Sequence, residues 1–156
     1  MDGDGWTTCA FGHQHWGRFG AAGLLAVAPG APWVLLQHRA PWSHGGDTWG
    51  VPGGARTRLE TAEQAARRET VEETALDVAR LDVVGEHLAD HGSWSYTTFV
   101  VTAPSRLPVV PERESIDLRW VAVHEVTDLP LHPAFAAAWP ALQLLIPYDQ
   151  PVPRVR

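Results

Sequence analysis

The chain has 156 residues, which is the size of a single domain with one sizeable core. Hydrophobic residues make up 45% of it and charged residues 19%, as is ordinary for a soluble globular protein. The formal net charge of −6 argues against nucleic acid or an anionic membrane as a partner, because both bind to a basic protein face. A small anionic ligand is still compatible with this charge, since a metal ion can offset the negative charge locally.

The cysteine content and the N-terminal sequence indicate the compartment. Cys9 has no second cysteine to pair with, which excludes an internal disulfide and fits a reducing environment. Residues 1–20 are polar and acidic, unlike a signal peptide. The longest apolar run, 21–36, is interrupted by Pro29 and Pro32 and so cannot span a bilayer. We therefore expect a cytoplasmic protein with no membrane partner.

Two strands and a capped helix are predicted in the first half of the chain. Apolar runs at 20–28 and 33–39, separated by the turn sequence PGAP, indicate a strand pair. A loop rich in Gly follows, with a short extended piece at 49–52. Thr61 and the glutamine three residues later have the spacing of a capping box, so a helix is predicted over 62–75, which lacks Gly and Pro.

The second half of the chain returns to strands before a closing helix. Residues 79–91 and 94–103 are predicted strands joined by a Gly-Ser turn, and 115–123 alternates polar and apolar residues like a half-buried strand. Residues 130–145 indicate a last helix, which we expect Pro140 to kink or break. Strands on both sides of a central helix indicate an α/β or α+β layered domain.

Glu69, Glu72 and Glu73 crowd one face of the central helix, within a sector of about 100°. No Lys or Arg lies between residues 70 and 77 to neutralise them, and like charges this close raise one another's pKa. A solvated helix face is the ordinary explanation of such a cluster. Clustered carboxylates are also the hard ligands that suit Mg²⁺ or Mn²⁺, which then bridge to phosphate oxygens.

The spacing of residues around this cluster resembles the Nudix signature, G-x5-E-x7-R-E-U-x-E-E-x-G-U, in which U is a bulky aliphatic residue. The match runs from Gly54 through Glu60 to RETVEETAL at 68–76, and it fills every charged position. Thr70 stands where an aliphatic residue is usual, and Ala75 stands where glycine is usual. Because glycine past a helix end commonly supplies a left-handed turn, an alanine there costs about 1 kcal/mol.

The resemblance implies a Nudix-type α/β/α sandwich around a mixed β-sheet, an α/β (α+β) fold. We assign residues 19–146 to this domain, 1–18 to an N-terminal extension that is part of it or flanks it, and 147–156 to an irregular tail. The resemblance also implies Mg²⁺-dependent hydrolysis, with Mn²⁺ as an alternative ion. The bond cleaved would be the diphosphate linkage of a nucleoside triphosphate, or of a nucleoside diphosphate joined to another group, and the nucleophile a metal-activated water.

The signature residues receive their expected roles from the same resemblance. Arg68 and Glu60 would orient the metal-binding carboxylates. Glycines at 53 and 54 would let the main chain approach the metal and the diphosphate where a side chain would block it. The expected metal ligands are three helix carboxylates and one backbone carbonyl: Glu69, Glu72, Glu73 and Gly53.

Two residues outside the signature are further candidates. Glu114 lies six residues before Trp120, the spacing of a late acidic residue at the metal site of MutT-type members. It competes with Glu69 for the role of general base, and Glu112 is a rival for its place. Arg39 occupies a strand end where MutT-type members often hold an arginine against the substrate phosphate, although a solvated arginine is an equal alternative.

The substrate and the class of activity stay open at this level. A MutT-like nucleoside triphosphate pyrophosphatase fits the chain best, but residues 131–133 (Leu-His-Pro) stand near the point where purine-reading members place an asparagine. ADP-ribose, dinucleotides and nucleotide sugars are therefore alternatives. The competing class is a non-catalytic nucleotide sensor, although such modules usually lose a glutamate that this chain keeps. Nucleic acid is not expected as a partner, and a homodimer stays open.

A second set of potential metal ligands lies near the N-terminus. Cys9, His13 and His15 have a spacing conceivable for zinc, but a closed structural site usually has four ligands, and the sequence offers no partner pair. Surface residues are the more ordinary interpretation. Trp42 and Trp94 are candidates for stacking against a base.

Overall fold

The computed structural model describes residues 1–43 and 45–148, so residues 149–156 of the predicted tail lie outside the described part. The helices are α1 (Ala62–Thr74) and α2 (Pro133–Leu145), with short 3-10 helices η1 (Val78–Arg80) and η2 (Val123–Asp128). The strands are β1 (Trp6–Thr8), β2 (Gln14–Trp16), β3 (Ala21–Ala28), β4 (Trp33–Arg39), β5 (Trp49–Gly50), β6 (Gly53–Ala55), β7 (Asp82–Asp90), β8 (Ser95–Thr102) and β9 (Ser115–Ala122).

Seven of the described strands form one mixed sheet. Its main path is β5–β4–β3–β8–β7, with β6 pairing with β3 and β9 with β4. The β3–β8 pair is parallel and the others are antiparallel, so the chain crosses over between β3 and β8 by way of α1. The predicted strand pairs β3–β4 and β7–β8 are confirmed, and β9 lies where the alternating segment was predicted.

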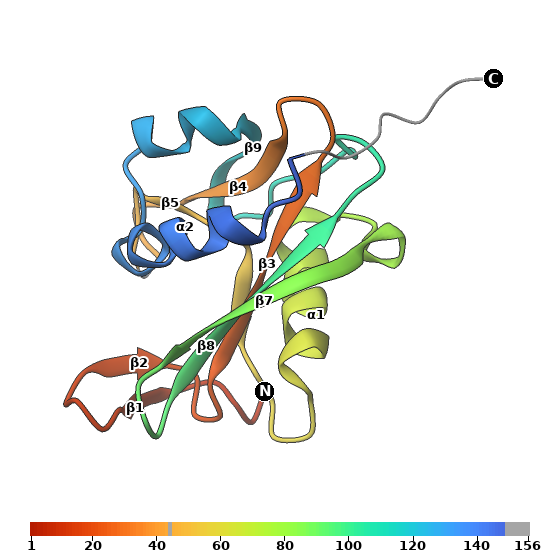
Figure 1. The fold of residues 1–156 in the computed structure, drawn as a ribbon. Coiled ribbons are helices and arrows are strands. Elements are labelled where there is room, and N and C mark those ends of the chain that lie inside the picture. The colour runs from red at the N-terminus through yellow and green to blue at the C-terminus, as the bar shows by residue number, and fades with distance from the viewer. Residues whose placement is uncertain (44, 149–156) are drawn as a thin grey trace.

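The sheet is covered on both faces, which explains why all eight residues of β3 are buried. Leu25 and Val27 belong to the hydrophobic core that α2 closes, and Leu24 and Ala26 to the core that α1 closes. The two helices accordingly lie on opposite sides of the sheet (Figure 1). The predicted α/β/α sandwich around a mixed sheet is confirmed. No helix among residues 1–43 and 45–148 is long and apolar enough to cross a membrane.

Helix α1 begins and ends as its sequence predicts. The Thr61 side chain accepts a hydrogen bond from the Gln64 N–H, and Gln64 reciprocates, which completes the capping box. The helix ends at Ala75, whose left-handed φ of 57° is the conformation that glycine usually supplies. Thr70 is fully buried, and its hydroxyl donates to the Ala66 carbonyl at 2.7 Å. Because the hydroxyl is hydrogen-bonded, its burial lowers the stability of the fold only slightly. Both departures from the signature therefore keep the backbone path.

Helix α2 is continuous through Pro140, so the predicted break at that residue is wrong. Pro133 opens the helix at a position where a missing N–H costs nothing. Phe135, Trp139 and Leu142 then fall on one face at spacings of four and three residues, and all three are buried against the sheet. This apolar packing holds the helix together at the one hydrogen bond that Pro140 removes.

Candidate active site

Strand β6 carries the glycine pair over the acidic face of α1. Gly53 and Gly54 pair with β3, and the Gly53 N–H donates to Glu73 Oε2 at 2.8 Å. A Cβ on Gly54 would lie 2.5 Å from the carboxyl carbon of Glu69, and a Cβ on Gly53 would lie 2.6 Å from the Tyr96 hydroxyl. The glycines are therefore required by the packing of this site itself, whatever approaches from outside.

Arg68 organises the carboxylates around it. Its guanidinium forms a bidentate pair with Glu60, in which Nε donates to Oε2 at 2.7 Å and Nη2 donates to Oε1 at 2.8 Å. The third nitrogen, Nη1, donates to Glu69 Oε1 at 2.8 Å. Glu72 is a looser partner at 3.5 Å, and half of its side chain is exposed. Glu60 also accepts the Thr57 N–H at 2.8 Å. Since both carboxylate oxygens of Glu60 already accept hydrogen bonds, Glu60 serves to orient Arg68. Arg68 in turn orients Glu69.

The carboxylates fall into two electrostatic groups. The hydrogen bonds from Arg68 lower the pKa of Glu60 to about 2. Burial raises the pKa of Glu73 to about 8, with the neighbouring Glu69 as a second cause, and burial also raises the pKa of Glu69. Only 8% of Glu73 is exposed, and the charge of Arg39 offsets its burial only in part. The buried Glu73 and the half-buried Glu69, whose ionised forms burial disfavours, constitute an oxygen donor set that a hard divalent cation fits.

A pocket of about 570 Å³ opens above this site. Four of the residues predicted to act in catalysis or substrate binding line it, Arg39, Gly53, Gly54 and Glu114, whereas the predicted metal ligands Glu69, Glu72 and Glu73 are not among its lining residues. The Glu114 carbonyl accepts the Ala40 N–H at 2.8 Å, which fixes the loop that carries Glu114 next to the end of β4. The rival Glu112 lies outside the pocket lining, and its carboxylate accepts the Glu114 N–H at 3.3 Å. The geometry therefore brings Glu114, not Glu112, to face the pocket.

Several lining residues were not predicted from the sequence. Trp6 and Trp16 reach the pocket from the β1–β2 hairpin, and the partly buried Tyr96 reaches it from β8. Nothing in the sequence relates an N-terminal hairpin to a site built on α1, so only the fold could reveal these residues. Both tryptophans proposed for base stacking line the pocket. Trp42 has 74% of its surface exposed, whereas Trp94 is buried and stacks on His15 at 3.9 Å.

The segment at residues 131–133 also reaches the pocket. His132 is one of the lining residues, and its ring accepts a hydrogen bond from the Ala134 N–H at 3.2 Å. It is thereby the N-terminal cap of α2. This hydrogen bond fixes the orientation of the His132 ring at the pocket wall.

A sandwich of this topology, with a glycine segment over an acidic helix beside a nucleotide-sized pocket, has the arrangement of a nucleotide pyrophosphohydrolase. The family model described as NUDIX domain matches residues 17–145, so the chain belongs to the Nudix family and is a Nudix hydrolase that acts on nucleotides. Members of this family generally use a divalent metal ion.

Two curated relatives and one solved structure give the degree of similarity. The chain is 54% identical over 151 residues to "Putative 8-oxo-dGTP diphosphatase 3" of Mycobacterium tuberculosis, covering 91% of this chain and 70% of the relative. It is 40% identical to a "Nucleoside triphosphate pyrophosphatase/Nudix hydrolase fusion protein" of Bifidobacterium longum, covering 88% of this chain and 30% of that protein. The crystal structure of a Nudix hydrolase from M. smegmatis, RenU, superposes with a TM-score of 0.86 at 48% identity, covering 96% of this chain and all of that one.

Proposed function

We propose that this Nudix hydrolase cleaves nucleoside triphosphates in a Mg²⁺-dependent reaction, and that an oxidised guanine nucleotide, 8-oxo-dGTP, is its preferred substrate. The choice of substrate is supported by the name of the relative that is 54% identical over most of this chain. The observation that carries the reaction itself is the carboxylate pair of the half-buried Glu69 and the buried Glu73, which lies beneath the glycine segment that lines the pocket.

Four groups would hold the metal, with Mn²⁺ able to replace Mg²⁺. They are three carboxylates and one backbone carbonyl: Glu69, Glu72, Glu73 and Gly53. A metal bound there supplies charge neutralisation of the diphosphate and a lower pKa for the attacking water. The three carboxylates differ in exposure, since Glu73 is buried and Glu72 half-exposed, so the ion would lie at the boundary between the helix and the pocket.

The other residues of the site position the reactants. Arg68, fixed by Glu60, holds the Glu69 carboxylate in one orientation. Arg39 places a positive charge at the pocket wall, where it can bind a substrate phosphate. Glu114 faces the same pocket and is exposed, so that it can accept a proton from the attacking water, the role for which Glu69 is the alternative.

Aromatic side chains give the pocket a surface for a base. Trp6, Trp16 and Trp42 all line it and are all partly exposed, at 52%, 42% and 74%. A flat aromatic ring stacks on any base, so these residues supply binding energy more than selectivity. Selectivity for an oxidised purine needs hydrogen-bonding groups, and His132 is the lining residue we propose for that task.

A substrate panel with product identification tests this function. The panel holds 8-oxo-dGTP, dGTP, ADP-ribose, a diadenosine polyphosphate and a nucleotide sugar, each assayed with Mg²⁺. We expect 8-oxo-dGTP to have the highest kcat/KM and to give the nucleoside monophosphate and pyrophosphate or the diphosphate and phosphate. A higher kcat/KM for ADP-ribose or a dinucleotide would contradict the substrate assignment. Tight nucleotide binding without turnover of any compound would contradict the enzymatic proposal as a whole.

A further inference from the structure

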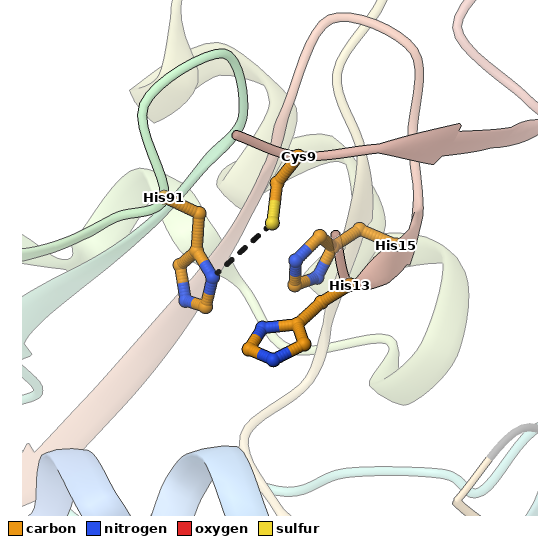
Figure 2. A group of neighbouring side chains, drawn as sticks. All are labelled: Cys9, His13, His15 and His91. Atoms are coloured by element: carbon orange, nitrogen blue, oxygen red, sulfur yellow. Dashed lines mark hydrogen bonds between the residues drawn. The ribbon is translucent and has the colours of Figure 1, made fainter. Parts of the chain in front are cut away.

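Four potential metal ligands from two distant parts of the chain meet beside the pocket. Cys9, His13 and His15 come from the β1–β2 hairpin, and His91 comes from the turn between β7 and β8. One ligand atom from each lies within 4.8 Å of the other three. Figure 2 shows the four side chains surrounding a common space, with Cys9 Sγ 3.9 Å from His91 Nδ1. We refer to these four residues as the Cys–His cluster.

The backbone holds the two turns of the cluster together. The Cys9 N–H donates to the His13 carbonyl at 2.9 Å, and the Gly12 N–H donates to the Cys9 carbonyl at 3.0 Å, which closes the hairpin turn. The Ala10 N–H then donates to the His91 carbonyl at 3.2 Å and ties this turn to the one after β7. The ligand atoms therefore project from a frame that is already assembled.

The separations suit a tetrahedral ion of the size of Zn²⁺. With Zn–S near 2.3 Å and Zn–N near 2.05 Å, the ligand atoms of a tetrahedral site lie about 3.3 to 3.6 Å apart. The observed limit of 4.8 Å requires the outermost side chains to turn inward by about 1 Å, which rotation about their χ angles can supply. Cys9 and His91 are already close to the required separation.

One buried ring nitrogen of the cluster points to a missing ligand. The Nε2 atom of His15 is buried and has no hydrogen-bond partner among the described residues, although such groups are usually satisfied. The same ring stacks on Trp94 at 3.9 Å, which fixes its plane. Cys9 is 5% exposed and supplies a sulfur ligand from the protected side.

We propose that the Cys–His cluster binds one Zn²⁺ ion, separate from the carboxylate site on α1. One thiolate and three imidazoles form a soft and borderline donor set that favours Zn²⁺ and gives Mg²⁺ no hard oxygen ligand. The ion would fasten the β1–β2 hairpin to the β7–β8 turn. Because Trp6 and Trp16 of that hairpin line the pocket, the zinc would also fix the aromatic wall against which the substrate binds.

Co²⁺ substitution reads out this site without relying on activity. The reduced protein is freed of metal with a chelator and titrated with Co²⁺ alone, in a Glu73→Gln background that weakens the carboxylate site. We expect one equivalent to produce intense visible d–d bands and a near-ultraviolet thiolate-to-cobalt charge-transfer band, both displaced by Zn²⁺. Oxygen ligands give no thiolate band, so binding at the α1 carboxylates is distinguished, and failure of the proposed catalytic function does not affect the result.

Two variants and a matched control complete the test. Cys9→Ser is expected to abolish the charge-transfer band, and His91→Gln to weaken Zn²⁺ binding by more than about 100-fold. His87→Gln, four residues earlier on β7, changes the same residue type outside the cluster and should bind Zn²⁺ like the unmodified protein. An absent thiolate band, or equal Zn²⁺ binding by His91→Gln and His87→Gln, would overturn the proposal.

The effect on the hairpin is measured by hydrogen exchange. We expect Zn²⁺ to slow the exchange of the amides of residues 6–16 by at least about tenfold, while the amides of α1 are unaffected. Zn²⁺ binding with unchanged exchange in the hairpin would leave the ion in place and refute its role in fixing the aromatic wall.

Discussion

The two clusters of ionisable residues in this protein differ in how they are assembled. The carboxylates of the candidate metal site, Glu69, Glu72 and Glu73, all come from α1, and their spacing along the chain is that of the helix itself. The Cys–His cluster joins residues 9–15 to residue 91, which only the packing of two turns brings together. A site carried by one helix is visible in the sequence, whereas the sequence shows only three of the four ligands of this shared site, and the fold adds His91.

The two clusters differ in chemistry as well. Glu69 and Glu73 are hard oxygen donors whose burial disfavours the ionised form. Cys9 and His15 belong to a sulfur and nitrogen set in which a buried ring nitrogen lacks a partner among residues 1–43 and 45–148. The two proposed sites would therefore select different divalent ions by ligand type. Experiments that disturb one cluster should leave the other intact.

The largest effect expected concerns the stability of the metal-free protein as a function of pH. Because folding raises the pKa of Glu73 from 4.5 to about 8, the folded state binds this proton more tightly than the unfolded state. The free energy of unfolding should thus fall between pH 4.5 and 8, by at most about 5 kcal/mol. Glu69 acts in the same direction, and Glu60, with its pKa lowered to about 2, contributes only in stronger acid.

Urea denaturation in chelator at several pH values measures this dependence. Glu73→Gln, which cannot ionise, should flatten it and should be more stable than the unmodified protein at pH 8. If the metal-free protein were equally stable at pH 5 and pH 8, the claim that burial disfavours the ionised form of Glu73 would be contradicted.

Substitution of Glu73 should also lower the activity strongly. Glu73→Gln keeps an acceptor for the Gly53 N–H but loses the charge that holds a cation, so kcat/KM should fall by about 10³-fold or more. Glu63→Gln is the matched control, because this glutamate lies in the first turn of the same helix and pairs with Arg67 at 3.1 Å instead. Comparable losses in the two variants would show that the helix, and not the site, had been damaged.

Arg68→Lys should have a smaller effect on activity. A lysine cannot reproduce the bidentate grip on Glu60 together with the bond to Glu69, so the Glu69 carboxylate loses its fixed orientation. We expect kcat/KM to fall about 10- to 100-fold, with a rise in the Mg²⁺ concentration needed for half-maximal rate. Arg67→Lys, one residue earlier, serves as the control, and it should leave the Mg²⁺ requirement unchanged.

The smallest effect is expected at the end of α1. Ala75 has a φ of 57°, so Ala75→Gly should raise the free energy of unfolding by about 1 kcal/mol and leave activity unchanged. Thermal or urea denaturation measures it. A destabilised Ala75→Gly variant would mean that the alanine methyl group contributes more by packing than the left-handed turn costs.

The sequence predicted the layered fold, the strand pairs and the capping of α1 because each depends on local patterns, such as apolar runs and the Thr61–Gln64 box. It misjudged α2 at Pro140, since the break expected from one missing hydrogen bond is outweighed by the burial of Phe135 and Trp139. Tyr96 and His91 could not have been predicted as neighbours of the pocket, because strand order across the sheet decides their place.

The central claim is that a divalent ion neutralises the acidic side chains of α1. Proton release on Mg²⁺ binding tests this claim most directly. With a pKa of about 8, Glu73 is mostly protonated at pH 7, so Mg²⁺ binding should expel about 0.9 proton from this residue. Calorimetric titration in buffers of different ionisation enthalpy measures it. We predict saturable binding with release of about one proton in the unmodified protein and in Glu63→Gln, and none in Glu73→Gln. The absence of binding at millimolar Mg²⁺, or binding with identical proton release in Glu73→Gln, would contradict the account.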